Sequence, residues 1–448
     1  METANELNNT GQHRAKKNSG RRHIVIIGGG FGGINAAKKL AKADVDITLI
    51  DKNNHHLFQP LLYQVATAAL SPGDIAEPIR AILGHYPNVD VLLAEVTGVD
   101  EERKHVLLSD GRAVDYDSLV MAAGAQYNYF GNDNWAKHAP GLKSIADALK
   151  IRERILLSLE KADQIEDVEK RKKYLRFVVI GGGPTGVEMA GAIAEIAKRN
   201  MMRDYHNFNR EETEIYLLEA APEILNGYPE NLAAKGHKML EDMGVIVKTD
   251  TAVTHIEENK VFTNEATYDT PNIIWGAGVV ANPVFETLNA ERDRAGRVKV
   301  GADLSLPSNP DIFVIGDAAH AEDEKGNVHP ALAPAAVQMG KYVAKILSKE
   351  NTARNREQRP DFKYVDKGTM ATIGRARAVA DIKGMHLSGF VAWALWSVVH
   401  VLFLVGFRNR LNVFVEWIWF YFTFRRGIRL ITDRPEEKIT EMNPVERM

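Results

Sequence analysis

Two glycine clusters, each followed by a single acidic residue, are the residues of this sequence best suited to bind a phosphate-bearing ligand. The first cluster has the spacing G-x-G-x-x-G at Gly28, Gly30 and Gly33, and Asp51 follows 23 positions after Gly28. Glycines at this spacing permit a tight turn, let backbone touch a pyrophosphate and let a helix pack closely on a strand. An acid some twenty residues further on accepts hydrogen bonds from a ribose. The pattern predicts a dinucleotide site, with an ordinary βα turn as the alternative.

The same spacing occurs a second time, at Gly181, Gly183 and Gly186. Here the acid is Glu219, which a polar insertion near residues 200–212 delays to 38 positions after Gly181. The spacing departs from the usual one, but the order of glycines and acid is the same. We therefore predict a second dinucleotide site.

A longer repeat supports the duplication. The segment Y-D-S-L-V-M-A-A-G ends at Gly124 and Y-D-T-P-N-I-I-W-G-A-G ends at Gly278, 96 and 97 positions after the first glycine of their respective clusters. Two dinucleotide folds in one chain indicate two dinucleotides, most simply a bound flavin and a visiting nicotinamide. Hydride would then pass between them.

Short apolar runs position both clusters, because one stands before each set of glycines and one before each acid. The predicted strands are Ile24–Ile27, Ile47–Ile50, Phe177–Ile180 and Ile215–Leu218, and a helix follows each glycine cluster. Residues Val89–Val114 alternate and turn at Asp110 and Gly111, which predicts a small antiparallel region. A further helix is expected over Ser144–Ala162.

A third glycine and acid pair, Gly316 and Asp317, ends the apolar strand Ile312–Ile315. In flavoproteins with two dinucleotide folds such a pair usually binds the ribityl chain, although an aspartate at this place can also cap a helix. The next predicted helix, Ala333–Leu347, has Pro334 in its first turn, where proline is tolerated. Its positive end would favour negative charge on a reduced flavin.

Composition limits the chemistry. The chain has 448 residues, enough for two or three domains, and a net charge of −3 that predicts no nucleic-acid partner. It has no cysteine, so it cannot pass electrons through thiols as disulfide reductases and sulfide:quinone reductases do, nor ligate an iron–sulfur cluster with cysteine. His55 and His56 have no third ligand at a familiar spacing, so no metal site is predicted.

The C-terminal part of the chain has two apolar runs. Gly389–Phe407 has His400 as its only ionisable residue and reaches the lower limit for a spanning helix, and Leu411–Phe424 is rich in aromatics. Basic residues lie between the runs and at both outer ends, which opposes a spanning hairpin. A polar stripe of Arg408, Asn412, Glu416 and Thr423 beside Trp419 favours a helix lying in the membrane interface. The alternative is a buried or dimer-forming helix pair.

With these motifs in place, the chain resembles the type II NADH dehydrogenases, single-subunit NADH:quinone oxidoreductases of respiratory membranes. The resemblance covers about residues 22–430. It rests on I-G-G-G-F-G-G, F-Q-P-L-L-Y-Q-V-A-T-A, G-G-G-P-T-G-V-E-M-A-G, V-I-G-D-A-A, A-P-A-A-V-Q-M-G and L-V-G-F-R-N-R-L. It implies bound FAD, NADH as substrate, a membrane quinone as acceptor and no proton pumping. It also implies peripheral, monotopic attachment to the cytoplasmic face of the inner membrane, with a homodimer possible.

The expected fold class is α/β, with two Rossmann-like dinucleotide-binding domains and a C-terminal membrane-associating helical region. The NADH domain would be inserted into a discontinuous FAD domain. The predicted bounds are 1–22 for a disordered basic tail, 23–145 and 295–365 for the FAD domain, 146–294 for the NADH domain and 366–448 for the C-terminal region. No apolar run follows the basic N-terminal residues, so no signal peptide is predicted.

The resemblance also implies binding residues. FAD would contact Gly28, Gly30, Phe31, Gly32, Gly33, Asp51, Lys52, Val96, Ala123, Gly124, Gly316 and Asp317. NADH would contact Gly181, Gly183, Pro184, Thr185, Gly186, Glu219 and Gly278. Glu219 is followed by two alanines and by no arginine that could bind a 2′-phosphate, so NADH is expected rather than NADPH.

Glu188 and Gln338 are the predicted catalytic residues. The resemblance places Glu188 near the flavin, in nucleotide or proton handling, but Thr185 and Glu188 also have the spacing of a capping box. The quinone region of the family has the pattern A-Q-x-A-x-Q-x-G, which Gln338 and Gly340 match while Pro334 replaces the first glutamine. Gln338 is therefore expected at the flavin and quinone face, with plain helix surface as the alternative.

Two other functions fit the same motifs. A soluble ferredoxin or rubredoxin reductase shares both dinucleotide folds but does not need the apolar C-terminal part. A non-enzymatic sensor would bind flavin and NADH and signal redox state to a partner.

Overall fold

The computed structural model describes residues 20–200, 204–350, 359–423 and 427–431. The predicted basic tail falls almost wholly outside them, as do three residues of the predicted polar insertion. The chain forms two compact units. The first unit takes the residues up to 57 together with 77–126 and 279–366, and the second unit takes 58–76, 127–278 and the residues from 367 onward.

A six-stranded sheet forms the centre of the first unit, in the order β20-β21-β9-β1-β2-β5. Its strands are β20 (Ser305–Leu306), β21 (Asn309–Val314), β9 (Ser118–Met121), β1 (Arg22–Ile27), β2 (Val45–Asp51) and β5 (Val89–Leu93). All neighbours pair in parallel except β20 with β21. The short apolar runs of the sequence become fully buried strands because the sheet is covered on both faces.

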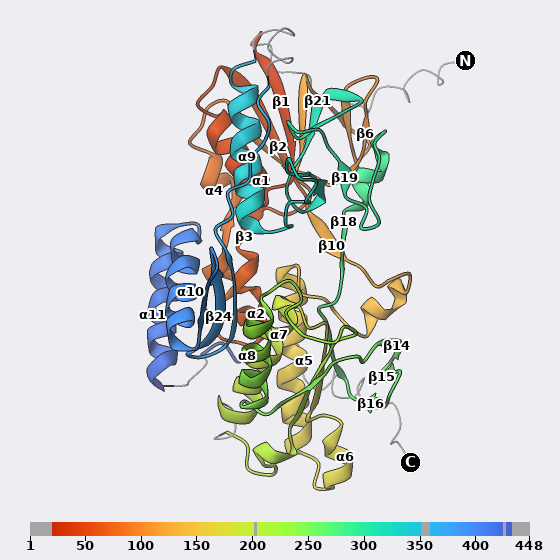
Figure 1. Cartoon of the computed structure of the whole chain (residues 1–448), viewed down its shortest axis with the longest axis vertical. Helices are drawn as coiled ribbons and strands as arrows, with labels where there is room; N and C mark the ends of the chain where they lie inside the picture. The colour runs from red at the N-terminus through yellow and green to blue at the C-terminus, as the bar shows by residue number, and fades with distance from the viewer. Residues whose placement is uncertain (1–19, 201–203, 351–358, 424–426, 432–448) are drawn as a thin grey trace, which may run out of the picture. The chain divides into compact units, whose positions relative to one another are not determined.

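Two helices of the first unit pack tightly against each other, α1 (Phe31–Leu40) and α9 (Ala333–Leu347) (Figure 1). Glycine permits this approach, since a Cβ at Gly340 would lie 2.3 Å from the carbonyl oxygen of Gly32. The predicted bounds of α9 are confirmed, with Pro334 in its first turn. A short helix, α4 (Ile79–Leu83), precedes β5.

The predicted antiparallel region is confirmed for β6 (Val96–Asp100), β7 (His105–Leu108) and β8 (Ala113–Asp115). It was wrong for the segment before them, because β5 joins the parallel sheet beside β2. Alternation in β5 places Val89 and Val91 in the core of that sheet, where an edge strand needs only one buried face.

The second unit contains a four-stranded parallel sheet in the order β13-β12-β11-β17. Its strands are β13 (Val245–Lys248), β12 (Glu214–Leu218), β11 (Arg176–Ile180) and β17 (Asn272–Trp275). Helices α5 (Ile145–Asp163), α7 (Pro184–Glu195) and α8 (Glu230–Glu241) belong to the same unit, as does a small antiparallel sheet of β14 (Val253–Glu257), β15 (Lys260–Thr263) and β16 (Thr267–Asp269). Helix α5 starts at a capping box between Ser144 and Asp147, close to its predicted start.

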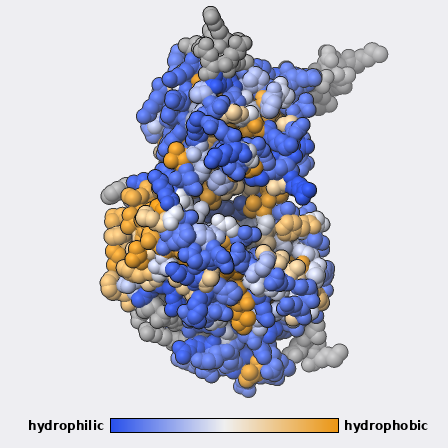
Figure 2. Space-filling view, viewed as in Figure 1, coloured by the Kyte–Doolittle hydropathy of each residue, from blue (hydrophilic) through white to orange (hydrophobic). Residues whose placement is uncertain are grey.

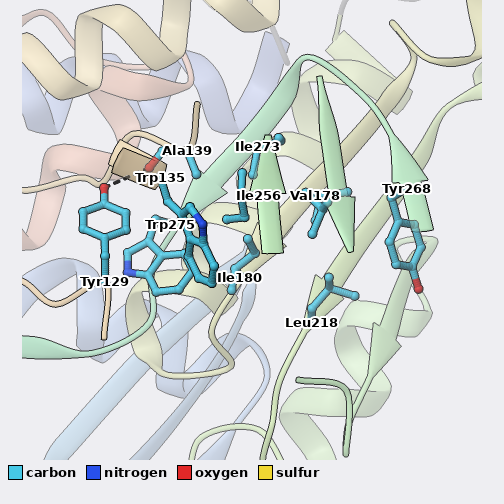
Figure 3. Close-up of a cluster of buried hydrophobic side chains, with 11 residues drawn as sticks. Tyr129, Trp135, Ala139, Val178, Ile180, Leu218, Ile256, Tyr268, Ile273 and Trp275 are labelled. Atoms are coloured by element: carbon cyan, nitrogen blue, oxygen red, sulfur yellow. Dashed lines mark hydrogen bonds between the residues drawn. The ribbon is translucent and has the colours of Figure 1, made fainter. Parts of the chain in front are cut away.

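An aromatic core lies at one end of this sheet (Figure 3). Trp275 stacks on Tyr129 with ring centroids 5.0 Å apart and contacts Trp135 edge-on. The Tyr129 hydroxyl donates to the carbonyl oxygen of Ala139 at 2.9 Å, so the one polar atom of that ring is satisfied. This packing fixes the end of β17, from which the chain continues to Gly278.

The C-terminal segment folds as part of the second unit. Strands β23 (Thr369–Gly374), β24 (Arg377–Ile382) and β25 (Met385–Ser388) form an antiparallel sheet, followed by helices α10 (Phe390–Phe403) and α11 (Phe407–Thr423). Residues 58–76, which include α2 (Leu62–Ala66) and α3 (Pro72–Ile75), also belong to this unit. Within the described ranges, no helix is both long and apolar enough to cross a membrane.

The predicted α/β fold class is confirmed, with two parallel sheets and a helical C-terminal segment. The compact units change at residues 126 and 278, earlier than the predicted domain bounds at 145 and 294. The segment from 367 is grouped with the second unit rather than standing apart. Which unit binds which nucleotide stays a prediction.

Candidate active site

The first predicted acid lies beside the first glycine turn. Asp51 ends β2, and its carboxylate accepts hydrogen bonds from the backbone N–H of Gly29 at 2.6 Å and of Asn53 at 2.6 Å. The carboxyl edge of a parallel sheet is where dinucleotides bind in this type of fold. Asp51 is therefore held in place by backbone while further lone pairs are left for ribose hydroxyls.

The first glycine turn has the geometry that a pyrophosphate needs. Gly28 has φ +104°, a conformation that side-chain-bearing residues rarely adopt, and a Cβ at Gly33 would lie 1.9 Å from the carbonyl oxygen of Gly28. A Cβ at Gly30 would meet no atom within 4 Å, so backbone there is open to a ligand. The first turn of α1 has no acidic residue, so nothing opposes phosphate at its positive end. These residues fit the ADP moiety of FAD.

The second site repeats this geometry residue for residue. Glu219 accepts from the N–H of Gly182 at 2.5 Å and from that of Ala221 at 2.8 Å. Gly181 has φ +105°, and a Cβ at Gly186 would lie 1.8 Å from its carbonyl oxygen. The insertion before β12 therefore lengthens the chain without moving the acid out of place.

The other residues of the second site lie at the start of α7 and after β17. Pro184 and Thr185 are exposed in the first turn of α7, Gly183 has open space at its Cβ position, and the first turn has no acid. Gly278 contacts an aromatic ring, since a Cβ there would lie 2.6 Å from the Phe130 ring. Their contact with NADH remains a prediction.

The remaining residues predicted to bind FAD lie mostly at one edge of the first sheet. Ala123 and Gly124 begin two positions after the end of β9, Gly316 and Asp317 begin two positions after the end of β21, and Lys52 directly follows β2. Gly316 lies next to α9, with its N–H 3.3 Å from the Met339 sulfur. The alternative that Asp317 caps a helix was wrong, because Asp317 lies inside the short 3-10 helix Gly316–Ala318, whose N-cap is Ile315. The other three residues are Phe31 and Gly32 in the first turn of α1 and Val96 in β6.

Glu188 lies on the wall of a cavity in the second unit. The capping-box interpretation was wrong, because α7 begins at Pro184 with Gly183 as its N-cap, so Thr185 is already inside the helix. The N–H of Thr372 approaches the Glu188 carboxylate at 3.5 Å, too far to satisfy it fully. Burial raises the pKa of Glu188 to about 8, against a smaller lowering by that contact.

The cavity has a volume of about 60 Å³. By the measure in which one water needs roughly 10–15 Å³, this is space for several water-sized groups. Its walls come from α2, α7, β23, α10 and α11, and they are aromatic and acidic. The lining residues are Tyr63, Gln64, Thr67, Ala69, Glu188, Ala192, Glu195, Thr372, Ile373, Gly374, Arg375, Trp393, Trp396, Ser397, Glu416, Trp417 and Phe420.

Most of these lining residues were not predicted from the sequence, although two signals existed. The segment F-Q-P-L-L-Y-Q-V-A-T-A contains Tyr63 and Gln64, but its residue types alone indicate no role for either side chain. Glu188, Ala192 and Glu195 stand at the i, i+4 and i+7 positions of one helix, a spacing that places them on one face. Only the fold shows that this face meets α2 and the C-terminal helices.

Gln338 lies on α9 of the first unit. Its side-chain nitrogen donates to the carbonyl oxygen of Val365 at 3.0 Å, and its side-chain oxygen accepts from the N–H of Val365 at 3.0 Å. Both ends of the amide are therefore occupied by backbone. This geometry assigns Gln338 a part in holding the segment after 359 against α9, and its predicted quinone contact stays untested.

His56 has a structural role. Its Nδ1–H donates to the carbonyl oxygen of Gly29 at 2.8 Å, and the ring packs edge-on against Phe31, 5.2 Å between centroids. Burial lowers its pKa, so the ring is neutral and donates to that carbonyl. In the part of the chain that the structure describes, no group of three histidine, aspartate or glutamate residues is arranged to hold a metal ion.

Comparison with known proteins identifies the family of the chain. Residues 22–340 match the family described as pyridine nucleotide-disulphide oxidoreductase, the class that both dinucleotide sites define. Residues 367–426 match the NDH2 C-terminal domain. The chain belongs to the type II NADH:quinone oxidoreductase family.

Individual relatives cover nearly the whole chain. The type II NADH:quinone oxidoreductase Ndh of Mycobacterium tuberculosis is 44% identical over 92% of this chain and 91% of its own length. The type II NADH:quinone oxidoreductase NdhA of the same organism is 42% identical over 93% of this chain and 90% of its own length. The solved structure of NDH2 from Plasmodium falciparum in complex with NADH has a TM-score of 0.82, 23% identity, and coverage of 90% of this chain and 99% of that one. At that identity the likeness concerns the fold.

Proposed function

We propose that this protein oxidises NADH and reduces a membrane quinone, with FAD as the bound redox group. The observation that carries the proposal is the duplicated site, in which Asp51 and Glu219 are held by backbone N–H groups beside equivalent glycine turns. FAD, when bound, accepts a hydride from NADH and gives two electrons to the quinone. As the family resemblance implies, the proposal includes no proton pumping.

The residues of the two units bind and orient the nucleotides. Asp51 accepts hydrogen bonds from the ribose hydroxyls of FAD, and Glu219 accepts them from the ribose hydroxyls of NADH. The backbone N–H groups at the N-termini of α1 and α7 face the pyrophosphates. A 2′-phosphate on the nucleotide would meet the Glu219 carboxylate with only Ala220 and Ala221 beside it. Repulsion between these negative groups selects NADH over NADPH.

The quinone binds in the cavity of the second unit. Reducing a quinone to a quinol requires two electrons and two protons. The hydride taken from NADH brings both electrons and one proton, so one further proton is needed. Glu188 on the cavity wall can supply it, because burial raises its pKa to about 8 and keeps it protonated at neutral pH. A protonated carboxyl donates a hydrogen bond to a quinone oxygen and then a proton as negative charge develops there. Gln338 is not needed for this step.

The C-terminal helices provide the surface that binds the membrane. Figure 2 shows an apolar patch at the left of the molecule, where Figure 1 draws α10 and α11. The exposed large apolar residues of these two helices make up the patch. They are Phe390, Val391, Val398, Leu402, Phe403, Leu411, Phe414, Val415, Ile418, Trp419 and Phe422. Asn409 and Val413 of α11 are buried, so α11 directs its apolar face outward, the reverse of a soluble helix. Arg408 and Arg410 flank this face and suit anionic lipid on the cytoplasmic side.

The test is an anaerobic titration of the FAD-loaded protein with NADH, followed by a short-chain quinone. We expect NADH to bleach the flavin absorbance and the quinone to restore it. Flavin that stays oxidised would favour a sensor. Reduced flavin that ignores quinone but reduces an iron–sulfur protein would favour a soluble reductase.

A further inference from the structure

A tryptophan on the wall of the cavity has a hydrogen-bond donor without an acceptor. Trp396 of α10 lines the cavity and is 2% exposed, and its indole N–H has no hydrogen-bond partner among the described residues. A buried N–H without a partner destabilises a protein, so such groups are rare in native structures. A ligand that accepts a hydrogen bond in the cavity would satisfy it.

The neighbouring tryptophan of the cavity shows the contrast. Trp417 donates its indole N–H to the side-chain oxygen of Gln64 at 2.8 Å, and the Gln64 nitrogen donates to the Tyr63 hydroxyl at 2.8 Å. Because indole is only a donor, this pairing fixes the orientation of the Gln64 amide. The Gln64 oxygen is therefore used by α11 and the Gln64 nitrogen by Tyr63 of its own helix, and the Trp396 N–H is left for another group.

Packing fixes the Trp396 ring in place. It stacks on His400 with centroids 4.2 Å apart and an angle of 26° between the rings, and it lies 5.3 Å from Trp417. His400 also bonds the Trp396 carbonyl oxygen through Nδ1 at 2.7 Å, and burial lowers its pKa to about 4, which keeps it neutral. The donor is thus presented by a rigid aromatic stack.

The other groups of the cavity restrict the chemistry of its ligand. Glu195 and Glu416 line it as well as the protonated Glu188, and no lining residue offers an anionic ligand a free positive partner. Arg375 lines it too, but its backbone N–H bonds Glu195 at 2.5 Å and its guanidinium lies over the Tyr421 ring, 4.5 Å from the centroid. Aromatic walls suit a flat, neutral ring that accepts hydrogen bonds through carbonyl oxygens.

We propose that the Trp396 indole N–H donates a hydrogen bond to one carbonyl oxygen of the quinone and so orients its ring in the cavity. The inference rests on the proposed function and names a substrate-binding residue for it. Glu188 on the wall of the same cavity serves the other carbonyl oxygen. The ring then has a fixed donor at one carbonyl and a proton donor at the other.

The test is the Trp396→Phe variant, which keeps an aromatic ring and removes the N–H. We expect kcat/KM for a short-chain benzoquinone to fall roughly tenfold, the effect of one ordinary hydrogen bond, chiefly through KM. NADH should reduce the flavin at the wild-type rate in anaerobic stopped flow, and turnover with ferricyanide, which has no carbonyl to bind, should be unchanged. Trp135→Phe is the matched control, because Trp135 is an equally buried tryptophan of the second unit outside the cavity.

A second replacement separates the hydrogen bond from ring size. Incorporating benzothienylalanine at position 396 keeps the bicyclic shape and puts sulfur in place of the N–H. We expect the same rise in KM, with a thermal midpoint at or above that of the wild type because a buried unsatisfied group has gone. A quinone kcat/KM within twofold of wild type, or an equal loss with ferricyanide, would overturn the inference. Wild-type protein that never reduces quinone would instead refute the proposed function itself.

Discussion

The two glycine motifs build nearly identical sites and then differ seven residues after their first glycine. In the first motif this position is Asn35, whose side chain donates back to the carbonyl oxygen of Phe31 at 2.8 Å, within its own helix. In the second motif it is Glu188, which lies on the wall of the aromatic cavity. The glycine turn and the acid have the same geometry in both motifs, and the two motifs differ on the outer face of the helix.

What covers each helix explains this difference. Helix α1 is covered by another helix, α9, across the close contact of Gly340 with Gly32. Helix α7 is covered by a strand, since a Cβ at Gly191 would lie 1.7 Å from the carbonyl oxygen of Ile373 in β23. A sheet edge with two helices beyond it leaves space that a closely packed helix pair does not. The second helix therefore borders a cavity, and the first packs closely on another helix.

The largest expected effects come from substituting the third glycine of each motif. We expect Gly33→Ala to abolish FAD retention and Gly186→Ala to abolish reduction by NADH while FAD stays bound. In each case the new Cβ would lie within 2 Å of a carbonyl oxygen, an overlap that costs about 3 kcal/mol or more. Flavin absorbance after purification and NADH titration measure the two effects. Gly73→Ala, with nothing within 4 Å of its Cβ position, is the control.

Replacing the Glu188 carboxyl tests whether the difference between Glu188 and Asn35, each seven residues after the first glycine of its motif, matters for quinone reduction. Glu188→Gln keeps the shape and removes the proton, so we expect quinone turnover to fall roughly 100-fold, the low end of general acid catalysis. Reduction of the flavin by NADH should remain fast. Asn35→Ala, the matched change in the first motif, should leave both half-reactions nearly unchanged. Equal rates of quinone turnover in wild type and Glu188→Gln would remove Glu188 from the mechanism.

The pH dependence sharpens the same point. The Glu188 carboxyl is protonated below its pKa of about 8, so quinone turnover should be level at neutral pH and fall about tenfold per unit above 8. The folded-state pKa lies above the ordinary value of 4.5, so folding favours the protonated form. Its contribution to stability is complete below about pH 4.5 and is lost as pH rises towards 8. Both dependences should flatten in Glu188→Gln, as rate profiles and thermal unfolding between pH 6 and 9 would show.

The sequence predicted the parts of the site that depend on local backbone geometry. The glycine spacing, the buried strands and the acids at the strand ends follow from rules that act within some forty residues, so Asp51 and even the delayed Glu219 could be placed. The cavity could not be predicted, since it joins α2, α7 and α11, and Gln64 bonds Trp417 across 353 positions of the chain. Nothing local distinguishes Trp396 from the other tryptophans of the tail. Only its packing shows that its N–H has no acceptor.

The smallest expected effect concerns Gln338, the residue of the first unit that the sequence favoured for the quinone face. Both hydrogen bonds of its side-chain amide are made with the backbone of Val365. Gln338→Ala should therefore lower the free energy of unfolding by about 1–2 kcal/mol, the value of two ordinary hydrogen bonds. Quinone KM should change less than twofold, because the cavity lies wholly in the other unit. Thermal unfolding and steady-state kinetics with a short-chain quinone measure the two effects. A large rise in quinone KM without loss of stability would return the acceptor site to α9, and the two motifs would then differ in the opposite sense.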